Sequence, residues 1–307
     1  MSEVRSYHGQ PVIKEPTWTW EIPCYFFTGG LAGASAGVAY LCELRGDAAG
    51  ARRAWATALV GVSVSPLLLI SDLGRPSRFL NMLRMVKVTS PMSIGSWILS
   101  ASGTGTAIAA ANAWLGLFPR LARVARPVAA LAGLPLSSYT AALVANTAVP
   151  VWHEARSTLP FVFVAGAGVS AGSALLLITP VSEGGAARRL ALAGAVAEIA
   201  LTEAMKRGLG EHREAYASGP AHSFDRAAAS LMAAGAGVLA LRGRRSRAAS
   251  GLAGALMLAG ALSTRWSVYK AGFSSAADPA AVIRPQRERI RRGLSRGAAR
   301  RVARTAA

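Results

Sequence analysis

The sequence predicts an all-α integral membrane protein with eight transmembrane helices, arranged as two packed four-helix bundles. Of its 307 residues, 52% are hydrophobic and only 16% are charged, and the mean hydropathy is +0.35. The charged residues gather in short clusters that separate long uncharged runs. Several of these runs approach or exceed the roughly 20 apolar residues that cross the hydrocarbon layer. This composition excludes disorder and argues against an ordinary soluble domain.

Eight segments are predicted to span the membrane. Seven of them contain no charged residue, and the sixth in order is apolar apart from Glu198 and Glu203. In chain order they cover residues 24–42, 54–71, 88–119, 127–152, 157–182, 190–205, 227–241 and 248–264. The third, fourth and fifth are comfortably long, whereas the last two are short for a spanning helix.

The flanks of these spans define three regions. Residues 1–22 lack the features of a cleaved signal peptide and are predicted to form an N-terminal interfacial segment, in which Trp18 and Trp20 suit a membrane boundary. The membrane domain is predicted at 23–266. Residues 267–307 carry ten Lys+Arg against two acids and are predicted to form a basic tail outside the membrane.

An even number of spans puts both termini on one side, which we call the terminal side. The connections on the opposite side hold twelve arginines, at 45–53, 120–126, 183–189 and 242–247. The positive-inside tendency places those connections in the cytoplasm, although the basic tail argues the other way. The balance favours a multi-pass protein of the plasma or inner membrane whose terminal side faces away from the cytoplasm.

The net charge of +19 does not indicate nucleic acid, because the basic residues lie between apolar runs rather than along one face of a soluble domain. We expect contact with membrane lipid instead. Haem is not expected, since the four histidines lie at or beyond the ends of the predicted spans, and two cysteines cannot hold a four-cysteine cluster. The sequence thus predicts no haem, no iron–sulfur cluster and no metal site in this chain; its histidines and cysteines are His8, His153, His212, His222, Cys24 and Cys42.

The connection after the second predicted span mixes charged and apolar residues at helical spacing. It reads DLGRPSRF at 72–79 and continues to SPMSIGSW at 90–97. One interpretation is an amphipathic helix at the membrane surface, followed by a Ser-Pro start to the third span. The other is a docking surface for a soluble partner, formed by Asp72, Arg75 and Arg78.

Together with WEIPCYFFTGGLAG at 20–33, YTAAL at 139–143 and VPVW at 149–152, these stretches resemble the NrfD family, the membrane subunits of polysulfide reductase type. The resemblance covers residues 18–264 and weakens after Arg189. It implies an eight-helix subunit that exchanges electrons between a quinone pool and a separate ferredoxin-like iron–sulfur subunit. A third subunit, containing molybdenum, is then expected to perform the substrate chemistry, so this chain is not expected to be active alone.

A polar stripe marks the fourth predicted span. Tyr139, Leu143, Asn146, Pro150 and His153 follow steps of four, three, four and three residues, which would put them on one helical face. Polar groups there must face protein or a cavity, and hydrogen bonding between helices is the alternative to a ligand site. The resemblance implies that Tyr139 lies at the quinone pocket, and the shared face makes Asn146 and His153 its predicted neighbours.

Two residues of the first span are predicted to form a second wall of that pocket. Glu21 and Tyr25 begin on the same side of the membrane and are four residues apart. The alternative interpretation is that they anchor the helix at the interface.

Glu198 lies nine residues after Arg189 and eight before Lys206, so it cannot reach either membrane boundary. An ionised carboxylate at that depth costs about 2.5–3.5 kcal/mol. We therefore predict that Glu198 faces the protein interior and relays protons; the alternative is a neutral side chain hydrogen-bonded to a neighbouring helix. Glu203 is explained by a boundary ion pair with Lys206 or Arg207.

A transporter and an inert membrane anchor are the alternative functions. A polytopic transporter without a redox role could use the same glutamates, but the sequence has no matching pair of Gly/Pro-broken spans in its two halves. An inert membrane anchor would need no polar stripe in the fourth span. The motif-bearing segments favour the electron-transfer subunit over both.

Overall fold

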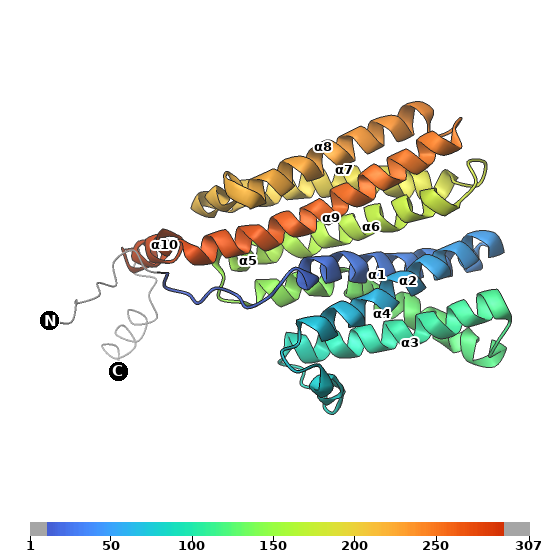
Figure 1. The fold of residues 1–307 in the computed structure, drawn as a ribbon, viewed down its shortest axis with the longest axis horizontal. Coiled ribbons are helices and arrows are strands. Elements are labelled where there is room, and N and C mark those ends of the chain that lie inside the picture. The colour runs from blue at the N-terminus through green and yellow to red at the C-terminus, as the bar shows by residue number, and fades with distance from the viewer. Residues whose placement is uncertain (1–10, 292–307) are drawn as a thin grey trace, which may run out of the picture.

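The computed structural model describes residues 11–291, and this part of the chain is built from helices. Eight of these helices have 20 to 31 residues and lie side by side along the longest axis (Figure 1). They are α1 (Glu21–Leu44), α2 (Ala48–Asp72), α3 (Pro91–Leu115), α4 (Pro119–Ala145), α6 (Leu159–Ile178), α7 (Gly185–Gly208), α8 (Gly219–Arg242) and α9 (Arg247–Ala277). The short elements are η1 (Pro76–Leu83), α5 (Pro150–Glu154), η2 (Ala155–Ser157), η3 (Gly210–Tyr216) and α10 (Pro279–Arg291).

The predicted all-α membrane protein is confirmed at this level. Within the described chain, five helices are long and apolar enough to cross a membrane, namely α1, α2, α4, α6 and α8. The chain is therefore a multi-pass membrane protein. Eight membrane spans remain a prediction, because α3, α7 and α9 match the others in length but do not meet the same criterion of hydropathy and charge.

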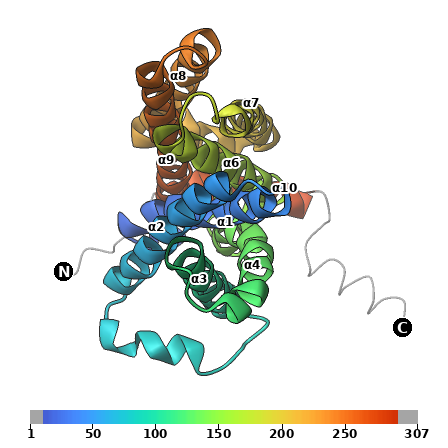
Figure 2. The ribbon, with the colours of Figure 1, turned by 90° about the vertical axis from the view of Figure 1, so that its right-hand side faces the viewer.

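The long helices fall into two groups that meet along α1. Helices α1 to α4 lie together on one side and α6 to α9 on the other, in both views (Figures 1 and 2). The two groups touch where a Cβ on Gly30 would lie 3.4 Å from Ala167 of α6. One turn away, the rings of Phe26 and Phe163 are 5.6 Å apart. Helix α1 thus packs against both groups.

The local sequence explains where several helices begin and end. Asp47 accepts a hydrogen bond from the Gly50 amide at 2.8 Å and caps α2. Ser90 caps α3, with Pro91 in its first turn, so the predicted Ser-Pro start is confirmed. Gly116 ends α3 with a φ of 69°, a left-handed conformation that glycine adopts without strain.

The predicted fourth span, 127–152, is not one helix. Helix α4 starts earlier, at Pro119, so Arg120, Arg123 and Arg126 lie in its first turns rather than in a loop. It ends at Ala145, and the separate short helix α5 begins at Pro150. Proline lacks the amide hydrogen that would continue the helix, and Val149 before it is extended. The prediction that His153 shares a helical face with Tyr139 is therefore wrong, whereas Asn146 directly follows α4 and its amide still bonds to the Ala142 carbonyl in the helical pattern.

The predicted end of the membrane domain at residue 266 falls inside α9. This helix continues to Ala277 and buries Val268, Tyr269 and Ser275, because residues 267–277 contain a single charge, Lys270. The first part of the predicted basic tail is thus packed helix. Residues 292–307 of the tail, and residues 1–10 with His8, lie outside the described residues.

The N-terminal segment packs against the end of α9, so both described ends lie on the terminal side. The ring of Trp18 stacks on Trp152 of α5 with centroids 5.6 Å apart. Its carbonyl oxygen accepts a hydrogen bond from the Tyr269 hydroxyl at 2.5 Å. Trp18 is therefore partly enclosed by protein, whereas Trp20 is exposed and remains suited to an interface.

Helices α1 and α4 approach each other through their glycines. A Cβ on Gly133 would lie 2.6 Å from the Gly33 carbonyl oxygen, and a Cβ on Gly33 would overlap the Gly133 backbone. Gly37, one GxxxG step later on α1, has no atom within 4 Å of its Cβ position among the described residues. Only part of the glycine repeat on α1 therefore serves close packing.

We expect Gly33→Leu to destabilise the protein by at least about 1–3 kcal/mol, because the side chain would force α1 away from α4. Gly37→Leu is the matched control, since the same side chain enters open space. The measurement is the thermal unfolding midpoint of the detergent-purified protein. Equal midpoints for the two variants would contradict the packing contact.

Candidate functional site

A largely apolar cavity lies among α1 to α4 and is closed from one side by η1. Its volume is about 460 Å³, which is within the range of small-molecule sites. Helices α2 and α3 supply most of the wall, including Leu59, Val62, Pro66, Leu69, Met92, Leu99 and Gly103. Such a wall suits an apolar ligand that is fixed by a few polar contacts.

Two phenols supply polar groups to this cavity. Tyr25 comes from α1 and Tyr139 from α4, and both line the wall. Tyr25 is 1% exposed, and its buried hydroxyl faces that of Tyr139 but makes no hydrogen bond of normal geometry among the described residues. Leaving a buried hydroxyl unpaired costs about 1–3 kcal/mol, so this hydroxyl is available to donate a hydrogen bond to an acceptor on a ligand.

Gly95 leaves room for the Tyr139 ring. A Cβ at this position of α3 would overlap the phenol carbon and oxygen. The glycine of the SPMSIGSW stretch therefore has a physical role, since any side chain there would move Tyr139 or separate α3 from α4.

The DLGRPSRF stretch forms the cover of the cavity. The connection does form a helix, the 3-10 helix η1, and its apolar residues Phe79, Met82 and Leu83 contribute to the wall. Asp72 also lines the cavity, and its carboxylate accepts hydrogen bonds from the Thr19 amide at 3.2 Å and hydroxyl at 2.9 Å. The three predicted docking residues therefore have different environments. Asp72 is hydrogen-bonded to the N-terminal segment, whereas Arg75 and Arg78 are exposed.

The other predicted pocket residues do not reach the cavity. Asn146 is exposed and donates a hydrogen bond to the Ala142 carbonyl at 2.8 Å. His153 is exposed, with its Nδ1 3.3 Å from the Ala145 carbonyl oxygen. Glu21 is buried, but its carboxylate contacts the Thr19 hydroxyl and does not line the wall.

A second polar site lies in the other helix group, around Glu198 of α7. Glu198 and Arg265 of α9 are each 1% exposed, and Arg265 Nη1 lies 3.9 Å from Glu198 Oε1. Arg265 also donates a hydrogen bond to the Phe163 carbonyl at 2.9 Å and lies over the Phe163 ring at 4.0 Å. The prediction that Glu198 faces the interior is confirmed.

Gly166 of α6 makes room for this pair. A Cβ there would lie 2.5 Å from both Arg265 Nη2 and Glu198 Oε1. Sequence reasoning missed Arg265, although one signal was present: it is a single arginine directly after the uncharged run 248–264, followed by four more uncharged residues.

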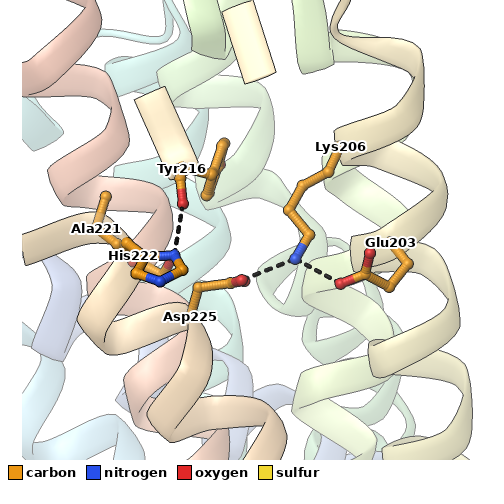
Figure 3. Close-up of polar contacts among 7 residues, drawn as sticks. Glu203, Lys206, Tyr216, Ala221, His222 and Asp225 are labelled. Carbon is orange, nitrogen blue, oxygen red and sulfur yellow. Dashed lines mark hydrogen bonds and ion pairs between the residues drawn. The ribbon is translucent and has the colours of Figure 1, made fainter. Parts of the chain in front are cut away.

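Toward the terminal side, Lys206 joins two carboxylates (Figure 3). Its ammonium group lies 2.5 Å from Glu203 and 2.7 Å from Asp225 of α8. The predicted Glu203–Lys206 pair is confirmed, and Asp225 extends it to a neighbouring helix. Beside it, His222 Nδ1 contacts the Tyr216 carbonyl at 3.1 Å, and burial raises the pKa of the Tyr216 phenol well above its usual range.

The family model for polysulphide reductase, NrfD, matches residues 7–207 of this chain. The chain belongs to the NrfD family. No curated protein matches it. NrfD proteins are membrane subunits of redox complexes, and this agrees with the apolar helices described above.

The NrfD match covers the first site completely and the second only in part. All residues that line the cavity lie before residue 144, inside the match. Glu198 and Lys206 are also inside it, whereas Asp225 and Arg265 lie beyond residue 207.

Within residues 11–291 of this NrfD protein, no three His, Cys, Asp or Glu side chains are grouped as a metal site. His153, His212 and His222 lie in α5, η3 and the first turn of α8, away from the middle of the long helices. Cys24 and Cys42 are both free and partly buried.

Arg265→Met is expected to lower the free energy of unfolding by about 3 kcal/mol, because it leaves the buried Glu198 without its counter-charge. The double variant Glu198→Gln/Arg265→Met is expected to recover much of that loss. Arg52→Met, at an exposed site, is the control. Thermal unfolding of the purified protein measures all three, and a double variant no more stable than Arg265→Met would contradict the pairing.

Proposed function

We propose that this chain is the quinone-reactive membrane subunit of a multi-subunit oxidoreductase, which exchanges electrons between a quinone/quinol pool and an iron–sulfur partner subunit. In this proposal all eight long helices cross the plasma or inner membrane, as two four-helix bundles made of α1 to α4 and α6 to α9. The observation that carries the proposal is the apolar cavity of about 460 Å³ with two tyrosines in its wall.

The chemistry of the cavity fits a quinone. A quinone has an apolar ring and tail and two carbonyl oxygens that accept hydrogen bonds, and it supplies two-electron chemistry when bound. The walls of α2 and α3 would contact the apolar part. The buried Tyr25 hydroxyl, which makes no hydrogen bond of normal geometry among the described residues, would donate to a carbonyl oxygen.

Each tyrosine has a distinct role in this proposal. Tyr139, which the family resemblance indicates, donates one hydrogen bond, and Gly95 preserves the position of its ring. Tyr25 donates the other. The proposed contacts do not include Asn146, His153 or Glu21, because these side chains lie outside the cavity wall.

The partners follow from family membership and from the exposed surface around η1. NrfD membrane subunits generally assemble with iron–sulfur and molybdoenzyme subunits. We propose that a ferredoxin-like subunit docks on Arg75 and Arg78, which are exposed beside the cover of the cavity. In this assembly the present chain contains neither haem nor an iron–sulfur cluster. A polytopic transporter without a redox role is not favoured, since the family is one of redox complexes.

Tyr25→Phe and Tyr139→Phe are each expected to weaken binding of a short-chain ubiquinone analogue by about tenfold, because each removes one hydrogen bond from an enclosed site. Titration of the detergent-purified protein, followed by tryptophan fluorescence, provides the measurement. Tyr40→Phe is the matched control on α1, since Tyr40 does not line the cavity. Affinities equal to wild type in both test variants would refute the proposed pocket.

Reversing the charges at Arg75 and Arg78 to Glu is expected to reduce co-purification of an iron–sulfur subunit at least about tenfold, because an acidic docking face would then be repelled. The same double reversal at Arg120 and Arg123, exposed on the opposite side, is the control. The amount of partner iron per membrane subunit is measured after purification in mild detergent. A larger loss in the control would move the docking surface to the other side of the membrane.

A further inference from the structure

We propose that a water-mediated link connects the buried Glu198 with the terminal-side surface between α7 and α8, and that protons move along it. The inference extends the proposed quinone function, because quinone chemistry consumes or releases protons as well as electrons. It concerns residues outside the cavity, and the test below needs no quinone.

The hydrogen bonds of the Glu198–Arg265 pair are incomplete. At 3.9 Å the two side chains are too far apart for a direct hydrogen bond. Among the described residues, both carboxylate oxygens of Glu198, and Nε and Nη1 of Arg265, are buried without a partner. Groups of this kind are costly to bury dry, and a bridging water is the ordinary way to satisfy them.

A small pocket lined by Glu198, but not by Arg265, has room for a water that would serve the Glu198 carboxyl group. Its volume is about 20 Å³, and a single water needs roughly 10–15 Å³ measured in this way. The polar groups beside it come from Glu198, Thr202 and Thr264. The Thr202 hydroxyl is itself buried and without a partner among the described residues, so a water here would meet the two or more polar contacts it requires.

The same pocket is also lined by charged residues at the terminal-side boundary. Glu203 and Asp225 line it together with Glu198, and both contact Lys206 (Figure 3). The Glu203 side chain is 43% exposed, whereas that of Lys206 is only 10% exposed. Thr202 lies one helical turn after Glu198 and lines the same pocket as Glu203 and Asp225.

The proton balance of the link is simple. A protonated Glu198 gives its proton to the water in the pocket, and the water, held by the Thr202 hydroxyl, releases one of its own protons to the carboxylate of Glu203 or Asp225, which lines the same pocket. That carboxylate then releases a proton to solvent. Glu198 is left ionised opposite Arg265, whose positive charge stabilises it, and Lys206 stabilises the ionised forms of the two outer carboxylates.

The test is hydrogen–deuterium exchange of the Glu198 carboxyl group, followed by infrared spectroscopy on the full chain in detergent without quinone. We expect the spectrum of the wild type at acid pH to contain a protonated-carboxyl band that Glu198→Gln removes and Glu198→Asp shifts. After transfer to D₂O, Thr202→Val is expected to slow the isotope shift of that band about tenfold, because it removes a hydroxyl that holds the water. Thr106→Val, at another buried and unpartnered threonine on α3, is expected to leave the rate unchanged.

Two outcomes would overturn the link. A wild-type spectrum without a band that responds to Glu198 substitution would mean that this residue does not titrate. An exchange rate in Thr202→Val equal to that in Thr106→Val, whether or not both are slower than wild type, would remove the route. Neither of these results bears on the tyrosine variants of the cavity, so the quinone proposal is tested separately.

Discussion

The close contact of α1 with its neighbours on two sides sets the position of both polar sites. On one side the backbones of Gly33 and Gly133 meet, which holds α1 against α4 and brings Tyr25 to the same cavity as Tyr139. On the other side the next residue, Phe26, packs on Phe163, and Phe163 in turn lies under Arg265. Two neighbouring residues of α1 therefore serve different sites: Tyr25 is part of the cavity wall, and Phe26 packs on the Phe163 ring beneath Arg265.

The sequence predicted the environment of a polar residue best where its position within a single span decides that environment. Glu198 was expected to face inward because it is too far from either boundary, and Tyr25 and Tyr139 do share one cavity. His153 was misassigned because Pro150 breaks the fourth predicted span, and Asn146, at the end of α4, bonds to the helix backbone instead of lining the cavity. Spacing along one helix cannot report such a break once the segment is taken to be continuous.

Other features depend on contacts between distant segments, which a single sequence does not contain. Arg265 pairs with a residue 67 positions earlier, across two helices. The DLGRPSRF stretch combines two roles that its spacing does not separate: Asp72 bonds to Thr19, whereas Arg75 and Arg78 stay exposed. Gly95 belongs to the SPMSIGSW stretch, but only the fold shows why glycine is needed there: the Tyr139 ring occupies the place of a side chain.

The family match supports the cavity and the Glu198–Arg265 site to different extents. Every residue of the cavity wall lies within 7–207, so family membership and local geometry point to the same function there. Arg265 and Asp225 lie outside that range, and the support for the proton link is therefore physical only: incomplete hydrogen bonds, a pocket large enough for one water and carboxylates that reach the surface.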